Sequence, residues 1–239
     1  MKLEQAKKLI DKNRAAYNII VKKFSDTRKY LWSELYFFNK YVASGDSVLD
    51  AGCGNGRLLQ MLEQKNISYT GIDISPRLVA IAKAQHPNQT FLAGDITNLP
   101  FPDNKFNAVF CIATLHHIPG KELREKTIKE FHRVLKKGGC LLMTNWNLWQ
   151  PRWWPLHSFF MVKKLIGLNR LDWFDILKPW KNETGAVVAE RYLHAYTQAG
   201  LRKLLEKNGF QIARQYYTAK KTRSNWYSGY NLITVAEKP

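Results

Sequence analysis

The feature that most constrains the fold is a short apolar strand that runs into a glycine-rich turn and then into a helix. Residues 47–51 are short and apolar, Gly52, Gly54 and Gly56 follow, and the leucines of 58–62 are spaced as on one face of a helix. Glycines at such a junction allow positive φ and a close approach of a ligand to the backbone. The unit therefore predicts an open α/β sheet with a ligand site at this turn.

The same alternation of strand and helix continues along the chain. It predicts a mostly parallel, doubly wound sheet with right-handed crossovers, which is a Rossmann-like α/β fold. Lys137, Gly138 and Gly139 are predicted to stop a helix before the fifth strand. The further strands are expected at 68–72, 90–93, 108–112, 140–144, 210–219 and 232–236, and the helices at 17–24, 30–41, 76–84, 122–135 and 197–208.

An excess of positive charge is the main compositional clue to a partner. The 239 residues carry a formal net charge of +18, with a pI of about 9.8, and such an excess concentrates polyanions at a surface. Nucleic acid is the first expectation, an acidic membrane the second, and a merely basic protein the plain alternative. Of two basic stretches, 121–137 and 202–223, the second has only Glu206 against it, so its Lys220 and Lys221 are expected to contact RNA.

The sequence gives no sign of export or of membrane insertion. The N-terminal stretch is charged and lacks the apolar core and cleavage site of a secretory signal. No window approaches the roughly 18 to 20 uninterrupted apolar residues that span a bilayer. Cys53, Cys111 and Cys140 are scattered rather than paired. We therefore expect a cytoplasmic protein with no stable membrane insertion.

Three acidic residues stand at the ends of the first three strands. Asp73, after the second strand, lies where an acid accepts hydrogen bonds from ribose hydroxyls in doubly wound nucleotide sites, and Asp95 is placed to accept from an adenine amino group. Each acid alone could be a solvated loop charge or a helix cap. Together they predict a nucleoside-containing cofactor. The residues assigned to it are Asp50, Gly52, Gly54, Asn55, Gly56, Asp73, Ile74, Asp95, Ile96 and Ile112.

The spacing of the glycines distinguishes two cofactors. The pyrophosphate of NAD binds at a helix N-terminus through a G-x-G-x-x-G loop, whereas this loop has G-x-G-x-G. Asp50, immediately before it, suits an ammonium group and would repel a pyrophosphate. S-adenosylmethionine carries an ammonium group and NAD does not, so S-adenosylmethionine is the expected cofactor.

Four stretches of the chain resemble a known family. D-A-G-C-G-N-G-R at 50–57, G-I-D-I-S at 71–75, G-D-I-T-N-L-P-F at 94–101 and the region 106–142 resemble the class I S-adenosylmethionine-dependent methyltransferases. The resemblance covers residues 46–145 and implies a seven-stranded sheet with a reversed last hairpin, which the two C-terminal strands can supply. It does not name the acceptor of the methyl group.

On this resemblance, the whole chain is expected to form one methyltransferase domain. Residues 1–44 would be a helical cover over cofactor and substrate, and residues 45–145 the cofactor-binding core. An aromatic-rich insertion or lid would follow the fifth strand at 146–190. The C-terminal helix and strand hairpin would occupy 191–239.

Shorter stretches resemble a narrower group, the tRNA wobble-uridine carboxymethyl methyltransferases, which esterify 5-carboxymethyluridine. They are Y-N-I-I-V-K-K-F-S-D-T-R-K-Y-L-W at 17–32, T-L-H-H-I at 114–118, K-P-W-K at 178–181 and R-Y-L-H-A-Y at 191–196. S-N-W-Y at 224–227 matches only partly. This resemblance implies tRNA as the substrate and, as in some relatives, a small adaptor subunit.

The substrate site is expected to hold a carboxylate, which is already anionic and needs cations and a partly dry pocket rather than a general base. Arg28 and Arg191, each inside a matching stretch, can bond a carboxylate through two N–H groups, with a surface or capping role as the alternative. His116 and His117 follow the fourth strand, at the edge where ligands bind in open α/β sheets. Their alternative is a hydrogen bond to a loop carbonyl, and they lack the spacing of metal ligands.

Aromatic residues supply candidate stacking surfaces for a nucleobase, although most aromatic side chains simply pack cores. The stretch 149–160, followed by Lys163 and Lys164, is interpreted as a lid, with a membrane-interface helix as the alternative. The aromatic residues assigned to the substrate are Tyr17, Trp32, Trp146, Trp180 and Tyr192.

Three functions remain open on these patterns. The leading hypothesis is a tRNA-modifying methyltransferase. The second is a methyltransferase of a small quinone or lipid precursor, which the H-H-I loop and the apolar insertion would suit. The third is a non-catalytic RNA-binding module, against which the intact Asp50, Asp73 and Asp95 argue.

Overall fold

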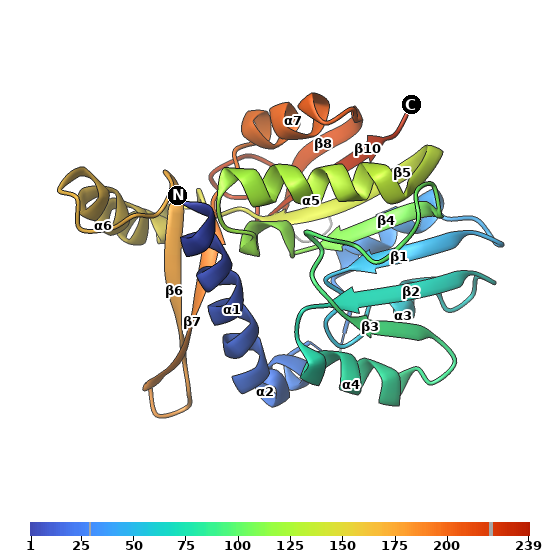
Figure 1. Ribbon diagram of the computed structural model, residues 1–239, viewed down its shortest axis with the longest axis horizontal. Coiled ribbons are helices and arrows are strands. Elements are labelled where there is room, and N and C mark those ends of the chain that lie inside the picture. Colours follow the sequence, from blue (N-terminus) through green and yellow to red (C-terminus); the bar gives the residue numbers. More distant parts are fainter. Residues whose placement is uncertain (29, 220–221) are drawn as a thin grey trace.

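The computed structural model describes residues 1–28, 30–219 and 222–239, and a sheet of eight strands forms its centre (Figure 1). The order across the sheet is β3-β2-β1-β4-β5-β10-β8-β9. Its strands are β1 (Ser47–Ala51), β2 (Ser68–Asp73), β3 (Thr90–Ala93), β4 (Phe106–Ile112), β5 (Leu135–Trp146), β8 (Gln211–Ala219), β9 (Thr222–Ser224) and β10 (Asn231–Glu237), and a separate hairpin consists of β6 (Asp175–Lys181) and β7 (Val187–His194).

Helices cover both faces of this sheet (Figure 1). Seven are α-helices: α1 (Leu3–Ile19), α2 (Val21–Asp26), α3 (Leu59–Leu62), α4 (Pro76–Gln85), α5 (Lys121–Val134), α6 (Trp154–Leu165) and α7 (Gln198–Lys207). Three short 3₁₀ helices, counted like the others in the described residues, are η1 (Ser33–Tyr41), η2 (Leu115–His117) and η3 (Pro151–Trp153).

The first five strands of the sheet run parallel, and the last hairpin is reversed. β1 pairs with β2 and β4, β2 with β3, and β4 with β5, all in parallel. β10 runs antiparallel between β5 and β8. The predicted mostly parallel, doubly wound sheet is confirmed. All seven expected strands are present, and the short β9 pairs with β8 and extends the sheet to eight.

Successive side chains of the central strands enter two different cores. Val48 packs in one core and Leu49 in the other, as a strand buried on both faces requires. Residues of α1, α5 and α7, including Phe131, cover the face of Leu49. Residues of η1, α3 and α4, including Phe38, cover the face of Val48. The apolar strands of the sequence therefore become the middle of three layers.

Helix limits differ from the sequence predictions in places. The run 17–24 is not one helix, since α1 ends at Ile19 and α2 begins at Val21, and the run 30–41 forms the 3₁₀ helix η1. The predicted helix 122–135 ends at Val134, before the glycine turn expected to stop it. Leu135 already pairs with β4, so the strand takes over from the helix directly.

The insertion after β5 is more regular than predicted. β6 and β7 pair antiparallel, with Lys178 opposite Arg191. β7 crosses the expected boundary at residue 190, so Arg191 belongs to this hairpin rather than to the C-terminal part. α6 lies at the outer end of the molecule in Figure 1. Its exposed apolar side chains are Trp154, Phe159, Met161, Val162 and Leu165.

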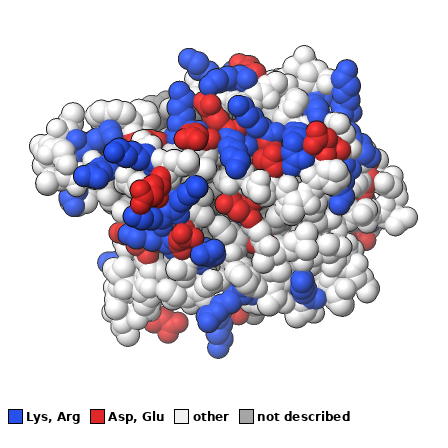
Figure 2. Space-filling model, in the orientation of Figure 1, with Lys and Arg blue, Asp and Glu red and all other residues white. Residues whose placement is uncertain are grey.

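No helix in the described residues is long and apolar enough to cross a bilayer. Charge on the face shown in Figure 2 is mixed: acidic and basic side chains lie interspersed across its upper part, where α5 runs in Figure 1. Arg133 pairs with Glu130 at 2.8 Å, and Lys207 of α7 pairs with Glu125 at 2.9 Å. Acids of the first basic stretch, 121–137, therefore neutralise part of the charge of both basic stretches.

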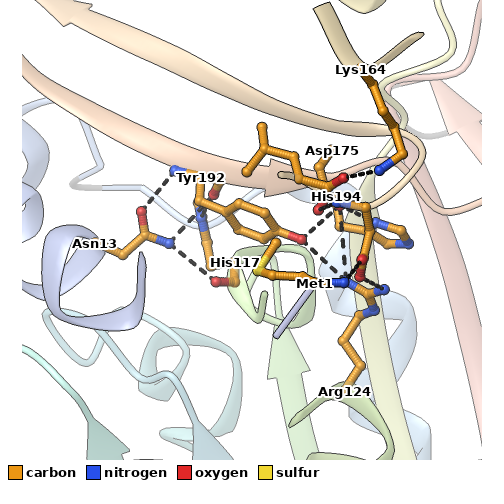
Figure 3. A network of polar contacts seen from close by, with 10 residues as sticks. Met1, Asn13, His117, Arg124, Lys164, Asp175, Tyr192 and His194 are labelled. Carbon is orange, nitrogen blue, oxygen red and sulfur yellow. Dashed lines mark hydrogen bonds and ion pairs between the residues drawn. The ribbon is translucent and has the colours of Figure 1, made fainter. Parts of the chain in front are cut away.

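A buried polar network joins the N-terminus, α5 and the hairpin (Figure 3). Tyr192 donates its hydroxyl hydrogen to Asp175 Oδ1 at 2.7 Å. Arg124 donates to the Tyr192 hydroxyl at 3.1 Å and to Asp172 Oδ2 at 3.2 Å, and the ammonium group of Met1 pairs with Asp172. The side chains of Arg124 and Asp175 are 8% and 0% exposed. The network holds β7 against the helices that cover the sheet.

We predict that Arg124→Met lowers the free energy of unfolding by about 3 to 5 kcal/mol, because it leaves the buried carboxylate of Asp175 without its cation. Urea unfolding at neutral pH measures the change. The control is Arg202→Met, whose 3.6 Å pair with Glu206 is half-exposed and should contribute about 1 kcal/mol or less. Equal losses in the two variants would contradict the role of the network.

Candidate cofactor and substrate site

The carboxyl ends of β1, β2, β3 and β4 open into one cavity. Its empty volume, including the solvent space at its opening, is about 1070 Å³. This is the edge at which ligands bind in open α/β sheets. Nine of the residues assigned to the cofactor line this cavity: Asp50, Gly52, Gly54, Asn55, Asp73, Ile74, Asp95, Ile96 and Ile112.

The glycine loop after β1 has a backbone conformation that residues with a Cβ atom rarely adopt. Gly52 and Gly54 have φ angles of 87° and 56°, and a Cβ atom on Gly52 would lie 2.3 Å from Thr114. Glycine is therefore required both for the backbone conformation and for the close approach of the loop after β4. Gly56 also has a positive φ of 80°, and a Cβ atom on it would lie 3.1 Å from His86 and 3.2 Å from Phe91. It does not line the cavity, and its assignment to the cofactor stays a prediction.

Two of the acids are oriented by backbone N–H groups. Asp73 Oδ2 accepts from Gly54 N at 2.9 Å, and its Oδ1 accepts from Ser75 N at 2.8 Å. Asp95 Oδ1 accepts from Thr97 N at 2.8 Å. A carboxylate oxygen has more than one lone pair, so both acids can still accept hydrogen bonds from hydroxyl or amino groups of a ligand.

Asp50 is buried and forms no ion pair with any of the described residues. It is 2% exposed, and its Oδ2 accepts from the Tyr69 hydroxyl at 2.7 Å. Burial, together with the charge of Asp73, raises the pKa of Asp50 to about 7, although the Tyr69 bond and the charge of Arg57 act in the opposite direction. An ammonium group beside this carboxyl would restore its charged form. Asp50 therefore fits the cation that the sequence predicts at this point.

The cover of the cavity comes from the N-terminal region. Tyr17, Arg28 and Trp32 line it, whereas Trp146 alone does so from the insertion at 146–190. No residue of α6 is among the lining residues. No residue of the stretch 149–160 lines this cavity. Its interpretation as a lid over the substrate stays a prediction, as does the cover at 1–44.

His117 lies at the cavity wall with both ring nitrogens engaged. Its Nδ1 donates to the carbonyl of Tyr192 at 3.1 Å, so Nε2 is the acceptor for the Tyr17 hydroxyl at 2.8 Å. Burial, together with the charge of Arg191, lowers the pKa of His117 to about 3. His117 is therefore a neutral group that positions Tyr17.

His116 takes a different place from its neighbour. It is fully buried and does not line the cavity. Its ring lies 4.8 Å from the ring of Trp146, whose backbone N–H contacts Nδ1 at 3.4 Å. Burial holds the pKa of His116 well below its usual value. The structure thus corrects its catalytic assignment to that of a packing residue behind Trp146.

Two guanidinium groups converge on one tryptophan. The guanidinium carbon of Arg191 lies 4.5 Å from the ring centre of Trp180, and that of Arg28 lies 5.7 Å from the same ring. Arg191 is 2% exposed, and in the described part of the chain its Nε and Nη1 have no hydrogen-bond partner. The rings nearest to the Arg191 guanidinium carbon are those of Trp180 at 4.5 Å and Trp146 at 5.6 Å, followed by Tyr17 at 5.9 Å.

Not every residue assigned to the substrate reaches a cavity. Tyr192 is 1% exposed and its hydroxyl is bonded to Asp175, so it holds the hairpin in place and its assignment as a substrate contact is corrected. Trp32, Trp146 and Tyr17 do line the cavity, while Trp180 contacts both arginines. Lys220 and Lys221 lie outside the described residues.

Sequence reasoning missed Arg57, the last residue of the D-A-G-C-G-N-G-R stretch. It lines the cavity, and its guanidinium carbon lies 4.7 Å from the ring centre of Trp32. Burial and the charge of Arg28 lower its pKa to about 10. Its position directly after the glycines of the loop could have indicated that it lies at the cofactor site. Among the described residues there is no cluster of His, Cys, Asp or Glu side chains that could hold a metal ion.

We predict that His117 makes stability depend on pH in a defined window. The folded protein keeps His117 neutral down to about pH 3, whereas the unfolded chain binds a proton below about pH 6.5. Stability from this group is thus complete above pH 6.5 and is lost as the pH falls. Compared with His117→Gln, the wild type should lose about 1.4 kcal/mol more per pH unit below about pH 6 in urea unfolding. Parallel pH profiles would exclude this role.

Comparison with known proteins identifies the same region. Residues 49–143 match the methyltransferase domain family. A tRNA (carboxymethyluridine(34)-5-O)-methyltransferase of Arabidopsis thaliana is 35% identical over 157 residues, which are 63% of this chain and 38% of that protein, so the chain spans well under half of that relative. The Schizosaccharomyces pombe protein of the same name is 28% identical over 93% of this chain and 94% of its own length.

Solved structures share the fold. A methyltransferase from Methanosarcina mazei superposes with a TM-score of 0.69 at 23% identity, covering 84% of this chain and 96% of that one. A Haloferax volcanii methyltransferase, solved in complex with a methyltransferase activator protein, gives a TM-score of 0.66 at 19% identity, covering 95% and 97%. At these identities the likeness is evidence for the fold alone.

A further relative matches most of its own length. A candidate methyltransferase of Encephalitozoon cuniculi is 31% identical over 192 residues, which cover 80% of this chain and 83% of that protein. The domain match, this relative and the strand order agree. The chain belongs to the class I S-adenosylmethionine-dependent methyltransferases.

Proposed function

We propose that this enzyme methylates the carboxylate of a 5-carboxymethyluridine at the wobble position of tRNA, giving a methyl ester. The observation that carries the proposal is the pair Arg28 and Arg191, which converge on Trp180 beside the cavity and have no acidic partner among the described residues. Both guanidinium groups can bond a carboxylate through two N–H groups. Two relatives with this activity in their names support the substrate.

Cofactor binding is assigned to the acids and glycines at the strand ends. Asp50 would face the ammonium group, Asp73 the ribose hydroxyls, and Asp95 the adenine, with Ile96 and Ile112 as apolar walls. Bound S-adenosylmethionine supplies an electrophilic methyl group. The glycine loop keeps this end of the cavity free of side chains, and the tuned pKa of Asp50 fits the cation.

The residues around the acceptor bind and orient it without removing a proton. A carboxylate is ionised at neutral pH, so positioning and charge balance are what the site must supply. Arg28 and Arg191 would hold it, and Trp180 would exclude water from one side of the pair. His117 has both ring nitrogens engaged and a pKa of about 3, which suits a positioning residue rather than a general base.

We propose tRNA and a small adaptor subunit as partners of the enzyme. The net charge of +18 favours a polyanion, and the fold neighbour from Haloferax volcanii was solved with an activator protein. We place the enzyme in the cytoplasm, where the free thiols of Cys53, Cys111 and Cys140 would stay reduced.

A second candidate function is methylation of a small quinone or lipid precursor. The observation that favours it is the outward face of α6, on which Trp154, Phe159 and Leu165 are 49%, 51% and 71% exposed. Such a face suits contact with lipid. It lies on an element that does not line the cofactor cavity, so it bears less directly on the acceptor than the two arginines do.

Cofactor affinity should depend on the ionisation of Asp50. Its pKa of about 7 without a ligand means that the carboxyl must lose a proton before it can pair with an ammonium group. Binding of S-adenosylmethionine should therefore tighten about tenfold per pH unit below pH 7, in calorimetry at fixed ionic strength. Asp50→Asn should bind weakly and without this dependence. A variant that keeps the slope would show that another group titrates.

Arg28→Lys should slow methyl transfer to a carboxymethyluridine-containing anticodon stem-loop roughly tenfold or more, because lysine keeps the charge and loses the two-pronged geometry. Affinity for S-adenosylmethionine should stay within about twofold. The control is Arg14→Lys on α1, where Arg14 pairs with Asp11 and is 49% exposed in its side chain. Full turnover by Arg28→Lys would remove this residue from the acceptor site.

With both substrates saturating, the rate of the chemical step should stay flat between about pH 6 and 8, because no group has to be deprotonated. Single-turnover measurements at several pH values test this. A rate that rises tenfold per pH unit would instead require a general base. That result would favour the small-molecule acceptor over ester formation.

A further inference from the structure

A second cavity adjoins the first and shares two of its walls. Trp32 and Trp146 line both. The other residues that line the second cavity are Glu34, Asn147, Arg152, Trp153, Lys178, Tyr230 and Asn231. They come from η1, the end of β5, η3, β6 and the segment that enters β10, so the hairpin and the main sheet build this cavity together. None of the residues assigned to the cofactor lines this second cavity.

Two cations in this cavity face rings rather than acids. Lys178 Nζ lies 4.5 Å from the ring centre of Trp153 and 5.8 Å from that of Trp146. The guanidinium carbon of Arg152 lies 5.5 Å from Trp153 and 5.9 Å from Tyr230. In the part of the chain that the structure describes, the ion pairs include neither cation.

The acid among the described lining residues bonds a neutral amide rather than either cation. Glu34 lines the same space, and its Oε1 accepts from Nδ2 of Asn231, another lining residue, at 2.9 Å. Burial, together with the charges of Arg191, Arg152 and Arg28, lowers the pKa of Lys178 to about 8. Lys178 and the neighbouring arginines therefore repel one another, and an anionic ligand between them would relieve this repulsion.

Flat surfaces accompany these cations. Trp153 is half-buried and Tyr230 is 45% exposed, so both rings can take a planar partner from the solvent side. Base-on-aromatic stacking together with backbone cations is how proteins bind single-stranded RNA. A single nucleotide combines the anion and the planar group that this cavity is built to receive.

We infer that the second cavity binds the nucleotide next to the methylated one, with Lys178 and Arg152 on the connecting phosphodiester and Trp153 or Tyr230 against its base. The inference rests on the proposed function, because the methylated nucleoside would occupy the first cavity. Trp32 and Trp146, shared by the two cavities, would separate the two bases. The enzyme would then read a short piece of single-stranded RNA around its target.

The test measures binding of a fluorescent RNA trimer, with carboxymethyluridine in the middle, to the full protein by anisotropy. Lys178→Met should bind about tenfold more weakly, and the slope of log K against log salt should fall by about 0.7, as loss of one phosphate contact requires. The control is Lys181→Met, an exposed lysine of the same strand that lines neither cavity. Equal melting temperatures of the two variants show that both are folded.

Neutral methylphosphonate linkages identify the phosphate. Replacing one of the two linkages that flank the central nucleotide should weaken wild-type binding about tenfold and should not weaken Lys178→Met further. Inorganic phosphate at the same concentration as the trimer should not compete. The inference is overturned if Lys178→Met binds like Lys181→Met, if neither linkage matters, or if free phosphate displaces the trimer.

The same samples separate this inference from the proposed function. If the wild type binds the trimer through Lys178 but transfers no methyl group to it, the proposed acceptor is wrong and the nucleotide site stands. If it methylates the trimer while both lysine variants behave alike, the acceptor stands and the nucleotide site is wrong.

Discussion

Positive charge that lacks an acidic partner is the constraint on which the site depends. Arg28, Arg57, Arg152, Lys178 and Arg191 surround two adjoining cavities and pack on aromatic faces. None of them is in an ion pair within the described residues. Rings compensate a desolvated cation only in part. We therefore propose that an anionic acceptor completes the arrangement.

The cofactor side has the opposite sign. Asp50, Asp73 and Asp95 line the same cavity as Arg28 and Arg57, so acidic and basic side chains share one space. The raised pKa of Asp50 and the lowered pKa of Arg57 have the same origin, which is burial without an adequate partner. Two ligands of opposite charge would stabilise both groups.

Arg191 is held in place through the hydrogen bonds of its neighbour Tyr192. The Tyr192 hydroxyl connects Asp175 with Arg124, its N–H donates to Asn13 Oδ1 at 2.8 Å, and its carbonyl accepts from His117. The register of β7 is thus fixed from α1, α5 and η2 at once. We propose that the insertion forms a wall of the substrate site.

Local pattern predicted the sheet, the glycine loop and the acids, because strand periodicity and strand-end positions are properties of short stretches. His116 and Tyr192 were assigned to the site for the same reason and are buried behind it, since pattern does not reveal which way a residue points. Arg57 and Lys178 were given no role, because their environment consists of rings distant in sequence. The hairpin that carries Arg191 depends on such contacts too.

We propose that Arg28 and Arg191 bind a carboxylate of RNA. Transfer of labelled methyl groups from S-adenosylmethionine tests this most directly. Bulk tRNA and a lipid extract, each from cells that lack the enzyme, would be offered in parallel with the full protein and its adaptor. The account predicts label in tRNA that mild alkali releases as methanol, as an ester requires. Alkali-stable label, or label in the lipid extract alone, would contradict it.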